Sequence, residues 1–106
     1  MDLDNVLNDV LKRVEATKRY TQALKDFDHN PTETTHNALK GALLQKYSCD
    51  NAILGNYELQ AWVKTVELKM IKNSKQMRVH SNDTHILYIQ RGRREGERAY
   101  LTVRLR

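Results

Sequence analysis

Residues 86–105, ILYIQRGRREGERAYLTVRL, decide the fold class of this chain. Apolar and polar side chains alternate from Arg98 to Leu105, and within the stretch from Ile86 to Arg91 the apolar Leu87 and Ile89 stand two residues apart. Alternation with a period of two is typical of β-strands that bury one face, so the stretch predicts an antiparallel β-hairpin. The expected inward side chains are Leu87, Ile89, Leu101, Val103 and Leu105. Those expected on the opposite face are Tyr88, Tyr100, Thr102 and Arg104.

Two glycines in the connection of this hairpin, Gly92 and Gly96, suit backbone conformations with positive φ. Upstream, residues 73–75 predict a loop, and residues 77–79 can form a further short strand. Residues 82–83, Asn-Asp, predict the turn that follows it. A lone hairpin is marginally stable in water, so its apolar face must pack on helices or extend a sheet across a dimer.

Further upstream, the apolar period changes to that of an α-helix. From Leu3 to about Phe27, apolar side chains keep the spacing of one helical face. The members of this face are Leu3, Val6, Leu7, Val10, Val14, Leu24 and Phe27. A helix of that length spans about 36 Å at about 1.5 Å per residue. A domain of this size does not need so long a helix, so part of the apolar face is expected to pack against another subunit.

The helical pattern breaks at residues 28–31, DHNP, where Asn30 can cap a second helix and the proline suits its first position. Glu33 stands where a capping box requires an acidic residue. This helix is expected to run to about Tyr47, and residues 48–51, SCDN, are expected to end it. Its buried side chains are expected to be Ala38, Leu39, Ala42 and Leu43, with Tyr47 as a further candidate.

A third helix is expected from Tyr57 to about Lys72, where apolar side chains recur with helical spacing. These are Leu59, Trp62, Val63, Val66 and Met70. Residues 63–71 also contain β-branched side chains and are compatible with a strand. The sequence therefore predicts an α+β fold, with about three helices followed by a small antiparallel β-hairpin or three-stranded sheet. Residues 1–106 are expected to form a single domain with a basic C-terminal hairpin.

Composition limits the cellular setting. The first residues lack a basic segment followed by an apolar one, and no apolar run approaches about 20 residues, so neither a signal peptide nor a transmembrane helix is expected. Cys49 is the only cysteine, which excludes an intrachain disulfide and a multi-cysteine zinc site. We therefore expect a cytoplasmic protein that keeps its thiol reduced and does not enter a membrane.

Positive charge is concentrated in the second half of the chain. Residues 1–50 contain seven Lys and Arg against eight Asp and Glu, which gives −1, whereas residues 51–106 contain eleven against five, which gives +6. Six of the nine arginines lie in residues 91–106. This asymmetry predicts a basic working face and a half that serves mainly as scaffold.

The arginine-rich hairpin predicts a surface that binds nucleic acid, because the rigid guanidinium group matches phosphate geometry. The loop arginines would contact phosphates, and the tyrosines would stack on unpaired bases from the same face as Arg104. The residues assigned to this site are Arg91, Arg93, Arg94, Arg98, Arg104, Tyr88 and Tyr100. The alternative is a solvated edge hairpin, charged to prevent edge-to-edge aggregation, in which Glu95 and Glu97 pair with the arginines.

Residues 80–85, HSNDTH, are the one segment that resembles a catalytic or metal site. Two imidazoles and a carboxylate can bind a metal or supply acid–base groups for cleaving RNA. The histidines have neither helical spacing nor a known ligand motif, and a turn explains the segment more simply. No catalytic residue, metal site or cofactor is therefore assigned.

Three functions are compatible with the sequence. The preferred one is a small, homodimeric, non-catalytic protein that binds RNA or DNA through its arginine hairpin. The second is a small regulator or inhibitor whose arginines recognise an acidic or nucleic-acid-binding protein partner. The third is a small ribonuclease that uses His80 and His85.

Overall fold

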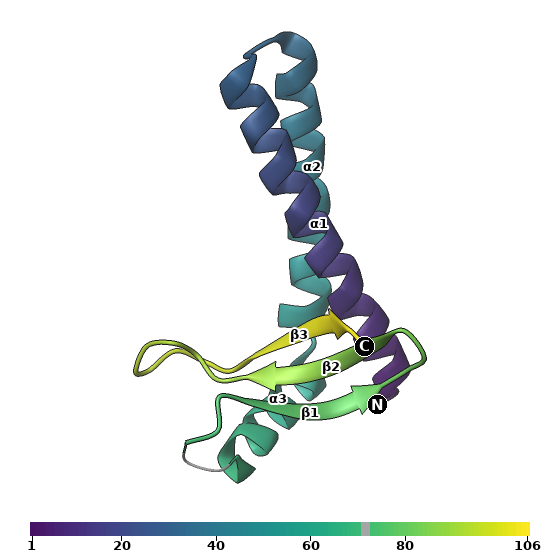
Figure 1. Ribbon diagram of the computed structural model, residues 1–106, viewed down its shortest axis with the longest axis vertical. Coiled ribbons are helices and arrows are strands. Elements are labelled where there is room, and N and C mark those ends of the chain that lie inside the picture. Colours follow the sequence, from purple (N-terminus) through teal and green to yellow (C-terminus); the bar gives the residue numbers. More distant parts are fainter. Residues whose placement is uncertain (71–72) are drawn as a thin grey trace.

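The computed structural model describes residues 1–70 and 73–106 of the chain. Three helices precede a three-stranded antiparallel sheet (Figure 1), so the α+β class predicted from the sequence is confirmed. The elements are α1 (Leu3–His29), α2 (Glu33–Leu54), α3 (Tyr57–Lys69), β1 (Gln76–Ser81), β2 (His85–Gln90) and β3 (Tyr100–Leu105). Within the described part of the chain, no helix is both long enough and apolar enough to cross a membrane.

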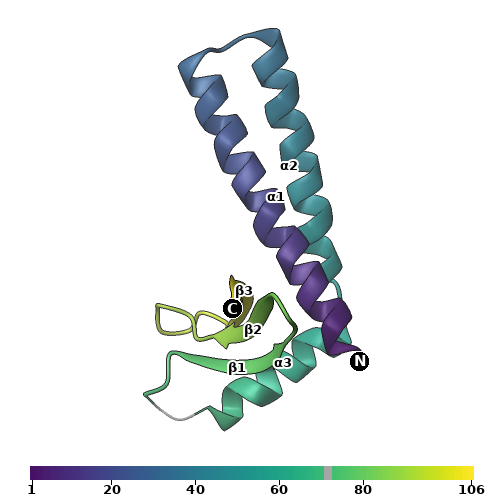
Figure 2. The same cartoon turned by 45° about the vertical axis from the view of Figure 1, so that its right-hand side comes forward.

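The two long helices α1 and α2 lie side by side as an antiparallel hairpin that projects away from the sheet (Figure 1, Figure 2). Asp2 caps α1, because its carboxylate accepts hydrogen bonds from the backbone N–H groups of Asp4 and Asn5. An acidic residue at this end also complements the positive end of the helix dipole.

The N-terminus of α2 differs from the predicted one. Thr32 is the N-cap, and Thr35 rather than Glu33 completes the capping box. The Thr35 backbone N–H donates to Thr32 Oγ1 at 3.1 Å, and the Thr32 N–H donates to Thr35 Oγ1 at 2.9 Å. Asn30 instead closes α1, where its N–H donates to the carbonyl of Asp26 at 2.9 Å. Two hydroxyl groups therefore do what the sequence analysis assigned to an amide and a carboxylate.

The C-terminus of α2 also differs, because the helix continues through residues 48–51 to Leu54. Asp50 lies against α1, where its Oδ1 accepts from Arg13 Nε at 2.9 Å. Its Oδ2 accepts from Lys46 Nζ, also at 2.9 Å. Asp in a helix interior normally competes for backbone hydrogen bonds, but these two ion pairs engage both of its oxygens. The predicted stop is therefore wrong.

The third element is a helix, as predicted, and the strand alternative for residues 63–71 is wrong over the part that the structure describes. Asn56 caps α3 by accepting the Leu59 N–H at 3.1 Å. The helix ends at Lys69, earlier than expected. The predicted end at Lys72 and the last residue of the strand alternative lie outside the described residues.

One hydrophobic core joins the first part of α1, the end of α2, α3 and one face of the sheet. Its members are Val6, Leu7, Val10, Ile53, Leu59, Val63, Met70, Leu87, Ile89, Ala99, Leu101 and Val103. The inward strand residues predicted from the sequence are confirmed except Leu105, which is 79% exposed. Leu105 pairs with His85 in the last rung of the ladder, past the core pair of Val103 and Leu87. Its side chain therefore extends beyond the core.

The far half of the helical hairpin has no interior. No residue from Thr17 to Ala52 is buried, and the whole of this stretch is described. The sequence analysis placed Leu24, Ala38 and Tyr47 on buried faces, but the structure exposes all three. Two helices side by side bury only the stripe between them, and these side chains lie outside that stripe.

The sheet has β2 in the centre, with β1 and β3 antiparallel to it on either side. A bulge in β1 between Arg78 and His80 shifts the register and brings His80 opposite Leu87. The turn predicted at residues 82–83 is present, and the side-chain oxygen of Asn82 accepts the backbone N–H groups two and three residues later. The short strand that the sequence suggested at residues 77–79 is therefore present as β1, and it is longer than expected, from Gln76 to Ser81.

The connection between β2 and β3 is longer than the predicted loop, because β2 ends at Gln90 and β3 begins at Tyr100. Gly96 has a φ of +84°, a conformation that glycine adopts without steric cost. A Cβ atom at Gly92 would collide with Glu97, so the two sides of the loop approach each other closely there. Both glycines are thus required by the loop, for different reasons.

Candidate nucleic-acid interface

The sheet has one face in the core and one that contributes no residue to the core described above. In Figure 1, α3 lies behind the sheet, and the second face is turned toward the viewer. We call this second face the open face. By strand register it carries Arg78, Ile86, Tyr88, Gln90, Thr102 and Arg104.

The centre of the open face is a tyrosine between two arginines. Tyr88 lies in the central strand, directly opposite Arg78 of β1 and Thr102 of β3. The Arg104 guanidinium carbon lies 5.6 Å from the centre of the Tyr88 ring, within range of a cation–π contact. The sequence analysis placed Tyr88 and Arg104 on the same face, and the structure brings them into contact.

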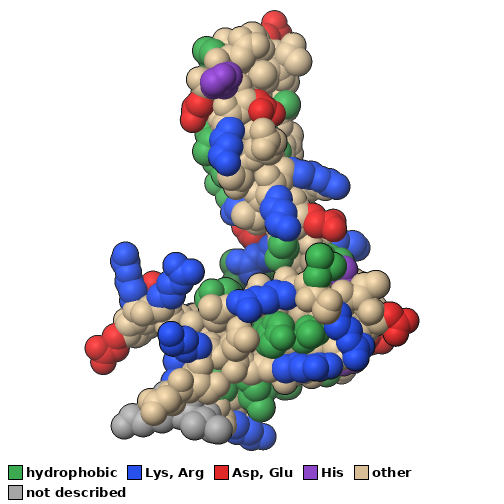
Figure 3. All heavy atoms as spheres, viewed as in Figure 1, with side chains coloured by type: hydrophobic (Ala, Val, Ile, Leu, Met, Phe, Trp, Pro, Cys, Tyr) green, Lys and Arg blue, Asp and Glu red, His purple; other side chains and the backbone are tan. Residues whose placement is uncertain are grey.

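The open face is free of acidic side chains. The three strands contain no Asp or Glu at any of their positions. The nearest acidic residues along the chain are Asp83 in the β1–β2 turn and Glu95 and Glu97 in the β2–β3 loop. Figure 3 shows hydrophobic side chains over the sheet with Lys and Arg around them. Such a surface attracts anions, because no carboxylate within the strands offsets its arginines.

The β2–β3 loop presents three exposed arginines, Arg93, Arg94 and Arg98. Arg94 Nε lies 4.0 Å from Glu97 Oε1, with the Arg94 side chain 88% exposed. Glu97 Oε2 also accepts the Arg93 backbone N–H at 3.1 Å. An exposed pair at this distance contributes about 0–1 kcal/mol. The pairing of glutamate with arginine proposed for a purely structural hairpin is therefore present but weak, and it leaves the Arg94 side chain accessible.

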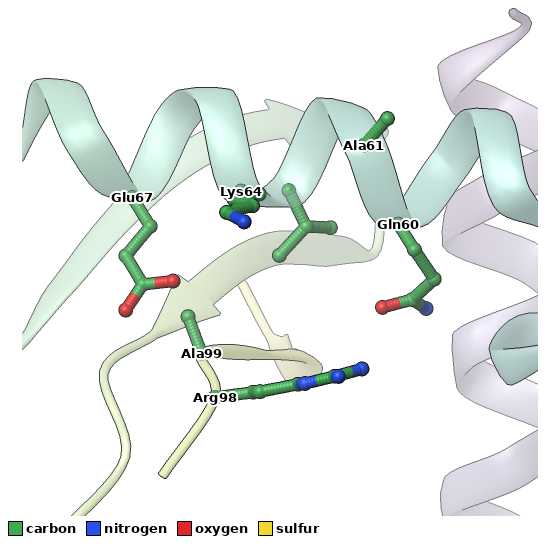
Figure 4. Close-up of a pocket in the computed structure, with 7 residues that line it drawn as sticks. Gln60, Ala61, Lys64, Glu67, Arg98 and Ala99 are labelled. Atoms are coloured by element: carbon green, nitrogen blue, oxygen red, sulfur yellow. The ribbon is translucent and has the colours of Figure 1, made fainter. Parts of the chain in front are cut away.

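Two other arginines of the predicted site lie away from the open face. Arg91 is half-buried, and its backbone N–H donates to the carbonyl of Lys75 at 2.9 Å. Arg98 precedes β3 and lines a hollow of about 360 Å³ under α3. Figure 4 shows its side chain extending below Gln60, while Glu67 points toward Ala99. Arg98 is thus an exposed residue beside the hollow between the loop and α3.

Tyr100 stands at the margin of the open face. It pairs with Gln90 at the first rung of β3 and is 40% exposed. It also borders a second hollow, of about 140 Å³, together with Arg13 and Leu54 of the helical hairpin. Of the seven predicted site residues, the structure therefore brings Tyr88 and Arg104 together on the open face and sets Tyr100 beside them. Arg93 and Arg94 lie in the adjoining loop.

Arg78 is a member of the open face that the sequence analysis did not assign to the site. Its Nη2 donates to Ser81 Oγ at 2.8 Å, and it lies opposite Tyr88. The signal was present, because Arg78 stands between Met77 and Val79 in the segment expected to form a strand. The strand expected at residues 77–79 was too short to show which residue of β2 would lie opposite Arg78.

The histidines of residues 80–85 have separate partners. His80 Nε2 lies 2.6 Å from Asp4 Oδ1 at the start of α1. His85 Nδ1 lies 2.8 Å from Thr84 Oγ1. Among residues 1–70 and 73–106, no group of three or more His, Cys, Asp or Glu side chains is placed to hold a metal ion. His80 therefore serves to connect the sheet to α1.

Comparison with protein-family models, with curated proteins and with solved structures found no match to this chain. Its function must therefore be inferred from the chemistry of the open face and the loop.

Proposed function

We propose that this protein binds single-stranded nucleic acid without catalysis, using the open face of its sheet and the arginines of the β2–β3 loop. The observation that supports the proposal is the placement of Tyr88 next to Arg104, at 5.6 Å, in the centre of a sheet face without acidic residues. An aromatic ring and a guanidinium plane are the two groups on which proteins stack unpaired bases.

The chemistry of this surface divides between the face and the loop. Stacking on Tyr88 or on the Arg104 plane would contribute about 1–3 kcal/mol per base and would tolerate any base, because every base has a π-face. Arg93 and Arg94 would neutralise phosphates and release counterions. The ligand is proposed to be single-stranded because bases within a duplex do not expose their faces to the sheet. RNA and DNA both satisfy these requirements.

An acidic protein surface would also satisfy the arginines, since carboxylates accept the same guanidinium hydrogen bonds. It would give the half-buried Tyr88 ring on the open face no stacking role, and for this reason nucleic acid is preferred. We also infer a reducing, cytoplasmic location, which fits a chain with Cys49 as its single cysteine.

The test is fluorescence anisotropy with labelled single-stranded RNA, single-stranded DNA and duplex DNA of equal length, at several salt concentrations. Binding to the single strands should weaken linearly on a log–log plot against salt, with a slope of about 0.7 per phosphate contacted. Replacing Arg93 and Arg94 together with Ala should lower that slope by about 1.4, if each arginine meets one phosphate.

A matched control removes the same charge elsewhere. Lys18 and Lys25 are exposed on α1, remote from the sheet in sequence, and their double replacement with Ala should leave the slope almost unchanged. Absence of binding at low salt would reject the proposal and direct attention to an acidic protein partner. An equal effect of the two double variants would show that binding follows net charge and not the β2–β3 loop.

A further inference from the structure

One exposed side of α2, beside its contact with α1, carries an apolar stripe. Leu44, Tyr47 and Leu54 are 63%, 54% and 56% exposed. Spacings of three and seven residues place them on one side of the helix. The stripe borders the side of α2 that meets α1, because Asp50, which pairs with Arg13 of α1, lies three residues after Tyr47 and four before Leu54. Lys46 lies 6.0 Å from the Tyr20 ring of α1 and 5.8 Å from the Tyr47 ring. We call Leu44, Tyr47 and Leu54 the α2 stripe.

The helical hairpin that carries this stripe lacks a core of its own. α2 has one buried residue, Ile53, at its end near the sheet, and α1 has none beyond Ala16. Helices in proteins gain most of their stability from packing an apolar face against other elements. Two helices without a third element leave such faces open to solvent, and stable helical bundles therefore usually contain more than two helices.

The solvent-accessible surface of the chain is larger than that of a typical globular protein of the same mass. The accessible surface is 7799 Å² for 12.4 kDa, whereas a monomeric globular protein of this mass exposes about 6,100 Å². The radius of gyration is 15.9 Å, against about 13 Å for a compact domain of this length. The excess of about 1,700 Å² is more than the roughly 800 Å² that each partner contributes to a stable interface.

The charge of the hairpin indicates which partner fits. α1 contains five acidic and five basic residues, and α2 contains two of each, so both helices have zero net charge. The chain's net charge of +5 therefore arises outside them. A surface that meets its own copy must not repel itself, and a neutral helical pair with an apolar stripe fulfils this condition.

We propose that the α2 stripe is the interface of a homodimer, in which the helical hairpins of two copies pack together in a two-fold arrangement. The hairpins would then supply one another with the core that each lacks, as in a four-helix bundle. The basic sheets remain outside the interface. This proposal does not depend on the function of the open face.

The test is sedimentation equilibrium of the full chain over a range of protein concentrations. The wild-type protein should reach the mass of a dimer, and its melting temperature should rise with concentration, because association stabilises the folded state. The variant Leu44→Gln/Tyr47→Gln should raise the dimer dissociation constant by about a hundredfold or more, since each change occurs twice in a two-fold interface. Both side chains are exposed, so the fold of the monomer, checked by circular dichroism, should persist.

A matched control replaces apolar residues that are exposed outside the stripe. Tyr57 and Leu68 on α3 are 86% and 79% exposed, and Tyr57→Gln/Leu68→Gln should leave the dimer intact. A wild-type protein that stays monomeric at all concentrations would overturn the proposal. The same holds if the monomer binds a different protein through the α2 stripe. A dimer that survives the change in the stripe, or one that is lost equally in the control, would also overturn it.

Discussion

At the scale of a single residue, a substitution at Tyr88 distinguishes the contribution of base stacking to binding from the contribution of charge. Its ring lies beside Arg104 on the open face and outside the core, and replacing it with alanine leaves the formal net charge of the chain unchanged. We predict that Tyr88→Ala weakens binding to single-stranded nucleic acid by about 1–3 kcal/mol while leaving the salt slope unchanged. Fluorescence anisotropy across the salt series measures both quantities in one experiment.

Two further variants check this prediction. Tyr88→Phe retains the ring and should bind like the wild type. Arg104→Ala should weaken binding and also lower the salt slope by about 0.7, if the guanidinium meets a phosphate. Equal binding by the Ala and Phe variants at position 88 would show that stacking on this ring has no part in recognition.

Replacing Leu87 or Leu105, two leucines of the β2–β3 hairpin, with alanine should have very different effects on the free energy of unfolding. Leu87 is fully buried in the central strand, and Leu105 is 79% exposed at the end of β3. Leu87→Ala should lower the free energy of unfolding by about 2–5 kcal/mol, because it removes packing and leaves a cavity. Leu105→Ala should change it by less than about 0.5 kcal/mol. Urea denaturation of both variants measures the difference, and similar losses would contradict the observed register.

Sequence patterns predict single residues well where a strand is regular. Alternation identified Leu87 and Ile89 as inward and Tyr88 as outward, because strand geometry requires it. Alternation did not place Arg98, since the chain leaves the ladder before β3 and turns toward α3. It also missed the role of Arg78, whose position opposite Tyr88 depends on pairing between strands.

At the scale of elements, Asp50 explains why α2 is longer than its sequence suggests. Its side chain is 16% exposed and accepts from both Arg13 and Lys46. We predict that Asp50→Ala lowers the free energy of unfolding by about 1.5–3 kcal/mol, since hydrogen bonds to charged groups are lost and two cations are left unpaired. Urea denaturation, with the exposed Asp28→Ala as control, measures this effect; an equal effect of the two changes would contradict it.

The bounds of the helices could be predicted only in part. The presence of all three helices could be predicted from the helical spacing of their apolar residues. The end of α2 was mispredicted because the residues 48–51 favour a cap when considered locally, whereas a long-range ion pair with α1 retains them in the helix. Its start was mispredicted because Asn30 and Thr32 are both good caps, and the partner hydroxyl of Thr35 decided between them.

At the scale of the whole molecule, neutral and basic parts are separated in space. The helical hairpin carries no net charge, and the basic sheet lies at one end of a molecule with extents of 49 × 31 × 27 Å. The change of period along the sequence predicted the α+β class but not this extended shape. The shape depends on the core contacting only the first part of α1 and the end of α2, which no local pattern specifies.

This separation leads to a prediction that joins the two proposals. A dimer formed through the α2 stripe would present two open faces, so a single strand long enough to reach both should bind more tightly than a short strand that covers one. The variant Leu44→Gln/Tyr47→Gln keeps the charge of the chain and should lose this advantage on the long strand. On the short strand, the variant and the wild type should bind equally, because neither changed residue lies in the sheet.

Anisotropy titrations with both strands, for the wild type, the stripe variant and Tyr57→Gln/Leu68→Gln, separate the possible causes. Weaker binding by the stripe variant on both strands would mean that the helical hairpin contacts nucleic acid itself. Equal binding on both strands by a variant shown to be monomeric would mean that the two faces of the dimer cannot engage one strand together. A loss confined to the long strand, absent from the α3 control, is the outcome expected from two open faces held by one neutral bundle.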